Sequence, residues 1–367
     1  MDSGMNPSAN GAEPLVSVLI VTYNGRKHIG DCLASVLDQD LPRQQYEVVV
    51  VDNASRDQTP AWVEQNFPAV RIIRLDRNYG PNTAVRLARP SLRGKYIAYA
   101  NQDIVAHRRW LPELLEAIKS HPRAGVVESN MILPQWLEYD PQHRDAPVQR
   151  AYVCDLTPLS IQDFRIVPVT PTTPPIHVLS AYCAACLMNP EILDQLGYWT
   201  DEGFFAYFDD IDLGLRLNAS GYEVLMAPRS LVYHDTIWLF QWSRRSVRRA
   251  YLSTRNMILV YYKLCYPSEF LRLLPRLFLG KLLRAGQHNP TGVGKLVYAL
   301  AATPLLLVSL VVALLKMPHY RKLRKLTMSH RITPPGWVVE SLQKLDWGAD
   351  RAVWGEHRTA AKESSGL

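Results

Sequence analysis

The feature that most constrains the fold is a regular alternation of short apolar runs and helical segments in the first third of the chain. Four of these runs are typical of buried strands, and they lie at 16–22, 46–52, 70–75 and 95–100. A segment with the apolar spacing of a helix follows each run. Strands that are apolar on both faces and alternate with helices build a parallel sheet covered on both sides, so the pattern predicts an α/β fold.

Polar residues follow each predicted strand. They are Thr22-Tyr23-Asn24, Asp52-Asn53, Arg77-Asn78 and Asn101-Gln102-Asp103. In such a sheet, ligands bind beyond the carboxyl ends of the strands. Neither GxGxxG nor GxxxxGK[ST] follows the first strand, which argues against a dinucleotide-binding fold and a P-loop NTPase. The other means of holding a nucleotide are strand-end side chains and a divalent metal such as Mg²⁺ or Mn²⁺, which takes hard oxygen ligands.

Three aspartates crowd into four positions of the segment FDDIDL, at Asp209, Asp210 and Asp212. The apolar spacing around them predicts a short helix, and aspartates in its first turn could cap free N–H groups. Carboxylates this close repel one another, so either a cation compensates them or one of them is a base with a raised pKa. Arg216 lies one turn after Asp212 and could neutralise one charge, which leaves two to explain.

The regular pattern breaks down between about residues 134 and 178, which are rich in proline and polar residues. A segment this irregular inside a domain predicts a lid, a binding loop or a mobile stretch. The five cysteines are odd in number and irregularly spaced, which argues against a disulfide framework and for a reducing compartment. CAAC at 183–186 has no second pair, so two small buried thiols are expected rather than a metal or redox site.

The second half of the chain is both apolar and basic. Residues 270–284 have the pattern of an interfacial helix, and 295–316 hold twenty uncharged residues between two lysines, enough to cross a bilayer core of about 30 Å. Pro304 interrupts this run, so a re-entrant or in-plane hairpin and a buried helix remain alternatives. The basic cluster at 321–325 would face the cytoplasm. The uneven charge favours an anionic membrane surface, and no signal peptide is visible in the first fourteen residues.

Six motifs occur in order along the chain: VSVLIVTYNG, EVVVVDNASRD, RNYGPNTA, YIAYANQD, GYWTDEGFFAYFDDIDLGLRL and PRSLVYH. With them, residues 15–236 resemble an inverting glycosyltransferase of family 2, and most of all bacterial enzymes that add rhamnose or galactofuranose to cell-surface polysaccharides. The resemblance implies the GT-A fold, a mostly parallel sheet flanked by helices. The chain is expected to comprise a disordered tail (1–14), the catalytic domain (15–236), a helical membrane-associated region (237–330) and a C-terminal tail (331–367).

Enzymes of this family displace a nucleotide diphosphate from a sugar by an acceptor hydroxyl, in a single inverting step. The resemblance implies that Asp103 binds the metal that bridges the diphosphate, with Asn101 in place of the usual acidic residue and His234 completing the coordination. It also implies that Asp210 is the general base, with Asp209 beside it in place of the commoner glutamate. A base next to another carboxylate should have a raised pKa.

The remaining site residues follow from their places in the family's motifs. The nucleotide sugar would be contacted by Thr22, Tyr23, Asn24, Asp52, Asn78 and Gly80, together with Asn101 and Asp103. The acceptor side would be formed by Trp199, Phe204 and Tyr207, with Asp212 on the same side in a supporting or structural role. Ordinary turn chemistry and core packing are the alternatives for these two groups.

The expected function is transfer of a hexose or deoxyhexose, such as rhamnose, to a lipid-linked or growing cell-surface glycan. The donor would be UDP- or dTDP-linked, the cofactor Mn²⁺ or Mg²⁺, and the location the cytoplasmic face of the cell membrane. Nucleic acid is not an expected partner, and a homo-oligomer is left open. Two alternatives are a non-catalytic nucleotide-sugar or glycan-binding scaffold of a polysaccharide assembly complex, and a nucleotidyltransferase, whose phosphate loop is missing after the first strand.

Overall fold

The computed structural model describes residues 13–134, 139–156, 162–235, 244–286 and 292–344. Its first part alternates strands and helices: β1 (Val16–Thr22), α1 (Ile29–Leu37), β2 (Tyr46–Asp52), α2 (Thr59–Asn66), β3 (Arg71–Arg74), α3 (Pro81–Ala88), β4 (Tyr96–Asn101) and α4 (Trp110–Ser120). The four predicted strands are confirmed to within one residue at each end. The predicted tail at 1–14 lies almost wholly outside the described residues.

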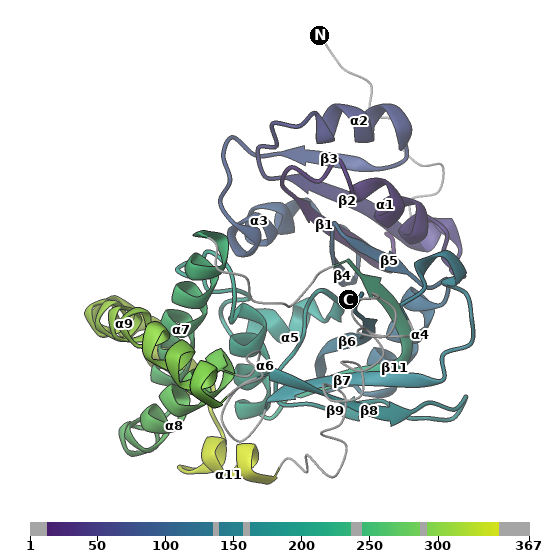
Figure 1. Ribbon diagram of the computed structural model, residues 1–367. Coiled ribbons are helices and arrows are strands. Elements are labelled where there is room, and N and C mark those ends of the chain that lie inside the picture. The colour runs from purple at the N-terminus through teal and green to yellow at the C-terminus, as the bar shows by residue number, and fades with distance from the viewer. Residues whose placement is uncertain (1–12, 135–138, 157–161, 236–243, 287–291, 345–367) are drawn as a thin grey trace.

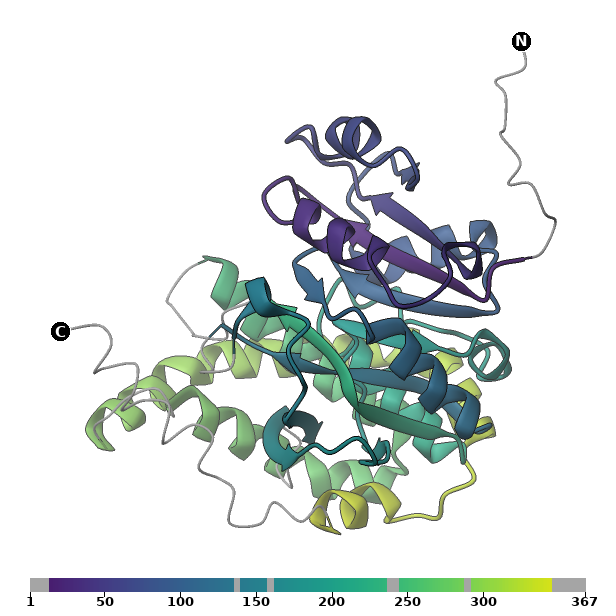
Figure 2. The same cartoon turned by 90° about the vertical axis from the view of Figure 1, so that its right-hand side faces the viewer.

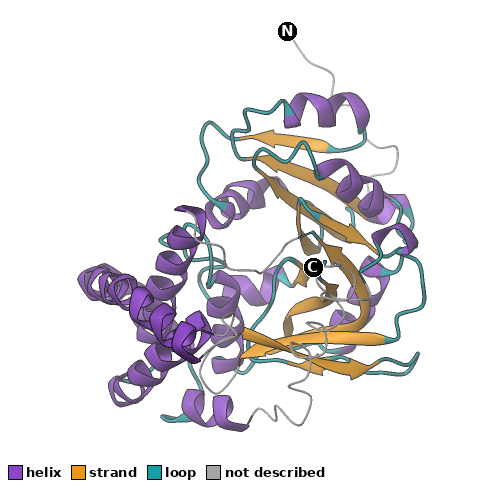
Figure 3. Ribbon diagram, viewed as in Figure 1, coloured by secondary structure: helices purple, strands orange, loops and turns teal. Residues whose placement is uncertain are grey.

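These strands belong to one large sheet, whose strands are drawn in orange in Figure 3. The strand order of the sheet is β3-β2-β1-β4-β10-β6-β11-β5, with β9 paired to β11. Its further strands are β5 (Ile104–Ala106), β6 (Ala124–Ile132), β9 (Ile176–His177), β10 (Ala185–Met188) and β11 (Glu223–His234). The first four strands run parallel, and so do β6 and β11, whereas β10 is antiparallel to both β4 and β6. The sheet is therefore mixed, and its parallel half is the part that the alternating pattern predicts.

Apolar side chains of the strands point alternately into two cores, one on each face of the sheet. On one face, Leu33 of α1 and Leu114 of α4 pack with Val18 and Ile20 of β1. On the other face, Leu19 of β1 packs with residues of α3, α5 (Pro190–Gln195) and α6 (Asp209–Ala219). Helices therefore cover both faces, as expected for an α/β fold.

The described residues after β11 form α7 (Arg244–Leu264), α8 (Pro267–Gly286), α9 (Gly292–Lys316), α10 (Arg321–His330) and α11 (Trp337–Lys344). Both views place α7, α8 and α9 away from α1 and α2, at the other end of the molecule (Figure 1 and Figure 2). A third core joins Ile211 and Leu215 of α6 to Ile258 and Tyr261 of α7. Helix α6 is thus held between the sheet and the C-terminal helices.

The chain beyond residue 330 continues the fold. Arg331 forms a buried ion pair with Glu269 of α8 at 2.8 Å, and Val338 and Leu342 of α11 are each 1% exposed. The prediction of a C-terminal tail from residue 331 is therefore wrong as far as residue 344, because an apolar helix face is buried there. Residues 345–367 lie outside the described part.

Helix α9 leaves an apolar face uncovered. By length and composition, one stretch among the described residues, Ala302–His330, could cross a membrane, and 17% of its apolar window is buried. Five exposed apolar side chains of α9, between 46% and 70% exposed, are Leu307, Val308, Val311, Leu314 and Leu315. Ser309 and Ala313, by contrast, are buried against the neighbouring helices. The helix therefore has one packed face and one apolar face without cover.

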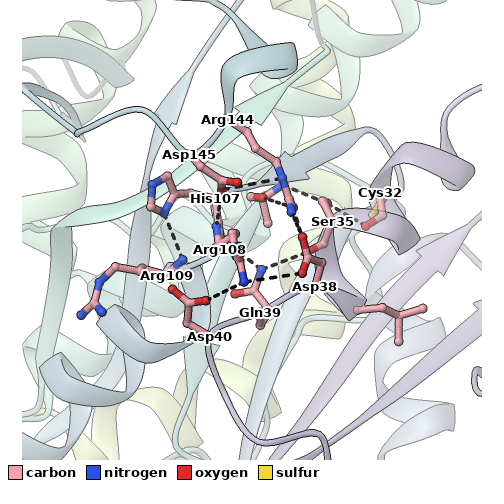
Figure 4. Close-up of polar contacts among 12 residues, drawn as sticks. Cys32, Ser35, Asp38, Gln39, Asp40, His107, Arg108, Arg109, Arg144 and Asp145 are labelled. Atoms are coloured by element: carbon pink, nitrogen blue, oxygen red, sulfur yellow. Dashed lines mark hydrogen bonds and ion pairs between the residues drawn. The ribbon is translucent and has the colours of Figure 1, made fainter.

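The irregular segment 134–178 contains a hairpin that the sequence pattern did not predict, formed by β7 (Arg150–Leu156) and β8 (Gln162–Pro168). Ahead of the hairpin, Arg144 forms an ion pair with Asp38 and donates hydrogen bonds to the carbonyl oxygens of Ser35 and Ala106 at 3.2 and 2.9 Å (Figure 4). Arg108 next to it donates its backbone N–H to Asp145 at 3.2 Å. Arg144 and Asp145 are thus fixed against α1 and the end of β5, which does not support the prediction of a lid at these residues.

Candidate active site

The carboxyl ends of neighbouring strands bring the predicted strand-end residues together. Thr22 at the end of β1 pairs in register with Asp52 of β2, and Val21 pairs with Asn101 of β4. His234 ends β11 and pairs with Ile104, just after the turn that follows β4. Residues far apart in the sequence therefore meet at one edge of the sheet, where ligands of such sheets bind.

The turn after β1 is held by Gln102, to which the sequence assigned no role. Thr22 Oγ1 donates to Gln102 Oε1 at 2.5 Å, and the backbone N–H of Tyr23 donates to the same oxygen at 3.1 Å. Asn24 adopts a left-handed φ of 51°, and its side-chain oxygen accepts from the N–H of Arg56 at 2.8 Å. Thr22 and Asn24 are thus parts of the turn itself, whereas the ring of Tyr23 is 42% exposed and available to a ligand.

Asp52 and Asn53 organise the next turn. The buried Asp52 carboxylate accepts the backbone N–H of Ser55, at 3.1 Å from Oδ2. Asn53 Oδ1 accepts the N–H of Tyr79 at 2.9 Å, which joins the turns after β2 and β3. Turn chemistry accounts for these contacts, so a role of Asp52 in nucleotide binding stays a prediction.

Gly80 connects the turn after β3 to the loop that precedes α6. Its N–H donates to Asn78 Oδ1 at 2.9 Å, and its φ is 80°. A Cβ atom at this position would lie 2.4 Å from the carbonyl oxygen of Phe205. Two residues later, Asn82 Nδ2 donates to the carbonyl oxygen of Phe204 at 3.0 Å. Glycine is required here both by its backbone conformation and by the close approach of that loop.

Asp103, His234 and Asn101 form a polar cluster at the sheet edge. His234 Nε2 lies 3.2 Å from Asp103 Oδ1 and 3.3 Å from Asn101 Nδ2, and His234 Nδ1 lies 3.2 Å from Met131 Sδ. Burial alone would raise the pKa of Asp103, but the hydrogen bond and the charge of His234 hold that pKa below its usual value. The carboxylate is therefore available as a ligand at neutral pH.

The Asp103–His234 pair fits a cation that is shared with a substrate. Within the described residues, no group of three His, Cys, Asp or Glu side chains could hold a metal ion. The pair supplies one hard oxygen and one imidazole nitrogen, which suit Mn²⁺, and a carboxylate alone would suit Mg²⁺. The other coordination positions would fall to diphosphate oxygens and water, as is usual for Mg²⁺ at phosphate sites.

Asp209 and Asp210 begin α6, and both are half-buried. Asp210 Oδ1 accepts the N–H of Ile211 at 2.8 Å. Burial, with the nearby negative charge of Asp212, raises the pKa of Asp209 to about 6, although hydrogen bonds, including one from Asn82, oppose the rise. The sequence predicted a raised pKa for Asp210, and the structure assigns one to its neighbour; the raised pKa of Asp210 stays a prediction.

The charges at the acidic start of α6 and the charge of Asp103 raise the pKa values of the same two tyrosines. Burial raises the pKa of Tyr99, and the charges of Asp209 and Asp103 raise it further. The pKa of Tyr182 is also raised by burial, with contributions from the charges of Asp210 and Asp103. The two acidic groups, which come from different elements, therefore border one region of the molecule.

Asp212 differs from the other two aspartates because it is buried and neutralised. Its carboxylate lies 3.0 Å from Arg216 Nε and 2.8 Å from Lys263 Nζ, and Lys263 also contacts Asp201 at 2.6 Å. Burial would raise the pKa of Asp212, but the charges of Lys263 and Arg216 hold it below its usual value. The predicted pairing with Arg216 is confirmed, and Lys263 is a partner that the sequence analysis missed.

Three of the four residues predicted on the acceptor side are buried. Trp199, Phe204 and Asp212 are 8%, 0% and 2% exposed, and the ring of Phe204 stacks on that of Tyr320 with centroids 6.2 Å apart. Packing uses the surfaces of Trp199 and Phe204, so the structure does not support direct contact of these two side chains with an acceptor. The burial of Asp212 beside Lys263 and Arg216 agrees with the structural role predicted for it. Tyr207 is 37% exposed, so the prediction remains for Tyr207.

Comparison with known proteins identifies part of the chain directly. Residues 17–150 match the family model described as glycosyl transferase family 2. An N-acetylglucosaminyl-diphospho-decaprenol L-rhamnosyltransferase of Mycobacterium tuberculosis is 28% identical over 239 residues, which cover 60% of this chain and 76% of that protein. The poly(ribitol-phosphate) β-N-acetylglucosaminyltransferase TarS of Staphylococcus aureus is 32% identical over 108 residues, but these cover only 29% of this chain and 19% of TarS.

Solved structures share the overall fold of this chain. GalNAc-T7, solved with UDP, GalNAc and Mn²⁺, superposes with a TM-score of 0.60 at 14% identity, over 91% of this chain and 57% of that chain. Residues 1–349 of Staphylococcus aureus TarS in complex with UDP-GlcNAc superpose with a TM-score of 0.52 at 18% identity, over 94% of this chain and 92% of that chain. These likenesses concern the fold. The match therefore identifies residues 17–150 as a region of glycosyl transferase family 2, and the superpositions show that the chain has the GT-A fold.

Proposed function

We propose that this chain is an inverting glycosyltransferase that moves a sugar from a nucleotide diphosphate sugar to a hydroxyl of a lipid-linked or growing cell-surface glycan. The observation that carries the proposal is the Asp103–His234 pair at the carboxyl ends of the strands, in a molecule whose helix α6 begins with Asp209 and Asp210. The charges of Asp103 and Asp209 both raise the pKa of Tyr99. The Asp103–His234 pair would hold the metal that binds the diphosphate of a donor, and the acidic start of α6 would take the proton of an acceptor hydroxyl. The family match, over residues 17–150, includes Asp103 but not His234 or the start of α6.

The proposed reaction is a single displacement. The acceptor oxygen attacks the anomeric carbon from the face opposite the diphosphate, and the proton of the hydroxyl passes to Asp210. The bond between the anomeric carbon and the diphosphate oxygen breaks, and its electron pair leaves with the nucleoside diphosphate. Configuration inverts because bond formation and bond cleavage take place on opposite faces. The negative charge of Asp209 beside Asp210 favours the protonated form of Asp210, and therefore favours transfer of the proton to Asp210.

Asp103 and His234, with Asn101 beside them, would hold the Mn²⁺ or Mg²⁺ ion, which when bound would supply positive charge to the departing diphosphate. The Mn²⁺ in the structure of GalNAc-T7, which shares this fold, supports a divalent metal as the cofactor. The nucleotide would lie over the turns that contain Thr22, Asn24 and Asp52, with the exposed ring of Tyr23 at its edge.

The sugar and the acceptor follow from the relatives. The name of the rhamnosyltransferase relative supports a deoxyhexose donor, which would be dTDP-linked, and a lipid diphosphate acceptor. The UDP-GlcNAc bound to TarS supports a UDP-linked hexose as the second candidate. A rhamnosyl donor is proposed first, because the alignment with that relative covers more than half of this chain.

We further propose that the enzyme acts at the cytoplasmic face of the membrane, with α9 lying in the plane of the interface. A helix that crosses a bilayer separates its ends by about 30 Å of hydrocarbon. Helix α9, however, packs along α7, which carries Arg248, Arg249 and Lys263 and stays on the catalytic domain. Directly after α9, Tyr320 packs against Phe204. The uncovered apolar face of α9 and the basic residues of α10 suit contact with an anionic leaflet of the membrane.

A donor screen followed by a transfer assay tests the enzymatic proposal. The protein is heated with UDP- and dTDP-sugars, with and without Mn²⁺ or Mg²⁺, and the true donor raises the unfolding temperature only with metal. D103N should abolish the metal-dependent shift, whereas D210N should keep donor binding and lose transfer by at least about 100-fold. Transfer at the wild-type rate by D210N would contradict the assignment of the base, whereas a wild-type protein that binds a donor but transfers no sugar would favour the non-catalytic scaffold.

A further inference from the structure

The turn before α6 has an unfavourable backbone conformation. Tyr207 and Phe208 have φ angles of 71° and 67°, in the left-handed region, and neither residue is glycine. Side chains with a Cβ atom rarely adopt this conformation, and two such residues in succession persist only where their surroundings hold them. Asp209 and Asp210 follow directly, so this turn sets the direction in which both carboxylates leave the backbone.

Asn256 of α7 holds this turn by its side-chain amide. Asn256 Nδ2 donates to two consecutive carbonyl oxygens, of Ala206 at 3.0 Å and of Tyr207 at 2.8 Å, and the residue is wholly buried. Arg255 Nε and Nη2 donate to Asn256 Oδ1 at 2.9 and 2.6 Å, and Nη2 also donates to the carbonyl oxygen of Gly203 at 3.2 Å. Since a guanidinium group only donates, it fixes which end of the Asn256 amide faces the turn.

Lys263 extends the same attachment two helical turns further along α7. A separation of seven residues places Asn256 and Lys263 on one face of the helix. Lys263 Nζ contacts Asp201 at 2.6 Å, at the start of the loop, and Asp212 at 2.8 Å, within α6. Helix α7 therefore holds the loop before α6 at its beginning and its end, together with the first turn of α6.

We propose that Asn256 is a positioning residue for glycosyl transfer, which holds the left-handed turn so that Asp209 and Asp210 are directed toward the acceptor hydroxyl. This inference rests on the proposed function, because it takes Asp210 as the general base. It assigns a catalytic purpose to a helix that lies outside residues 17–150, which match the family, and inside the region expected to serve membrane association.

The test compares Asn256→Asp with Asn218→Asp in the full chain. The aspartate at 256 can still accept from Arg255 but cannot donate to the two carbonyl oxygens of the turn. Asn218 is a matched control because its amide also donates to two consecutive carbonyl oxygens, of Val178 at 3.1 Å and Leu179 at 3.2 Å, at the far end of α6. N256D should lower kcat by about 10- to 100-fold, as expected for a misplaced catalytic group, with the donor KM within about twofold of wild type. N218D should lose thermal stability and keep its kcat.

Several outcomes would overturn the inference: a wild-type kcat in N256D, an equal loss of kcat in N218D, or a loss confined to the donor KM. If N256D does not fold, Arg255→Lys tests the inference instead, because lysine keeps the charge but cannot donate N–H groups from two nitrogen atoms to Asn256 Oδ1. In R255K, kcat should fall about threefold to tenfold, and an unchanged kcat overturns the inference. A wild-type protein inactive with every donor overturns the proposed function and this inference together. Full activity in D210N with a reduced kcat in N256D overturns the choice of Asp210 as the base but supports the role of Asn256 in positioning the turn for catalysis.

Discussion

Asp209 and Asp212 lie three residues apart on one helix, yet their pKa values are displaced in opposite directions. Burial raises the pKa of Asp209 to about 6, because its hydrogen bonds only partly offset the loss of water. Burial would do the same at Asp212, but Lys263 and Arg216 reverse the effect. Of the three like charges, that of Asp212 is neutralised by Lys263 and Arg216. The charge of Asp209 is not neutralised in this way, so its ionised form lowers the stability of the folded state.

The variant Asp209→Asn should therefore be more stable than the wild type at neutral pH. The folded state binds the Asp209 proton more tightly than the unfolded chain, so stability from this group is present at low pH and is lost as pH rises from about 3.8 through about 6. We expect D209N to raise the free energy of unfolding by about 1–3 kcal/mol at pH 8. Denaturant unfolding with EDTA across pH 4–8 measures the difference, which should shrink toward pH 4.

The opposite pH dependence, with the gain of D209N growing as pH falls, would contradict the raised pKa of Asp209. The companion variant Asp212→Asn serves as a control of opposite sign. Its pKa is held low in the folded state, so its contribution is present at neutral pH and is lost as pH falls below the usual range for aspartate.

Replacement of Lys263 by methionine should be strongly destabilising. Methionine keeps most of the apolar stem, but Asp201 and Asp212 then lose a buried cation at 2.6 and 2.8 Å. Breaking a buried pair in this way costs about 3–5 kcal/mol. Chemical unfolding of K263M, with exposed Lys322→Met as the control, measures this cost. Adding Asp201→Asn to K263M should recover part of the loss, and no recovery would show that the ion pair is not its source.

Sequence spacing predicted one of these contacts and could not predict the other. Asp212 and Arg216 are four residues apart, so helical geometry alone places them together. Lys263 and Asn256 come from a helix some fifty residues further along the chain, and their partners depend on how α7 packs on α6. The sequence likewise could not show that Trp199 and Phe204 are buried, because aromatic residues occur in cores as well as in sugar-binding sites.

At the scale of the elements, the junction between α3 and the loop before α6 should be sensitive to one methyl group. Gly80→Ala adds a Cβ atom 2.4 Å from the carbonyl oxygen of Phe205, at a φ of 80°. We expect a loss of about 1–3 kcal/mol in stability, and a lower kcat because the loop leads into the acidic start of α6. Differential scanning calorimetry and the transfer assay measure the two effects.

Gly197→Ala is the matched control for this junction. Its φ is also 80°, but the added Cβ atom meets the end of the Leu326 side chain at 3.0 Å, which can move. The conformational cost is then shared by both variants, whereas the collision with backbone belongs to Gly80 alone. Equal stability and equal kcat in G80A and G197A would show that the approach of the loop is not tight.

The elements that sequence periodicity missed have a common cause. The parallel strands β1 to β4 were predicted because each is apolar on both faces and is followed by an amphipathic helix. β10 is only four residues long and is inserted antiparallel between β4 and β6, which no local pattern indicates. The β7–β8 hairpin lies in a polar, proline-rich segment, and its strands depend on pairing with each other. Short strands that depend on pairing with distant segments cannot be predicted from local sequence patterns.

At the scale of the whole molecule, the C-terminal helices join the proposed membrane surface to the proposed catalytic centre. Helix α7 contacts α6 on one side and α9 on another. The acidic start of α6 and the uncovered face of α9 are therefore attached to the same helix. An enzyme built in this way would meet a lipid-linked acceptor with the orientation of its active site already set.

The last prediction concerns that uncovered face. Val311→Glu with Leu315→Glu places two charges where the side chains are 53% and 70% exposed, so folding should be unaffected. Binding to vesicles that contain anionic phosphatidylglycerol should fall at least about tenfold, because buried apolar area and electrostatic attraction together hold an interfacial helix. Ile332→Glu is the control, because Ile332 is 74% exposed but lies beyond α10. Alkaline carbonate should release the wild-type protein from membranes; retention would show that α9 crosses the bilayer, and unchanged binding of the double variant would remove α9 from the membrane contact.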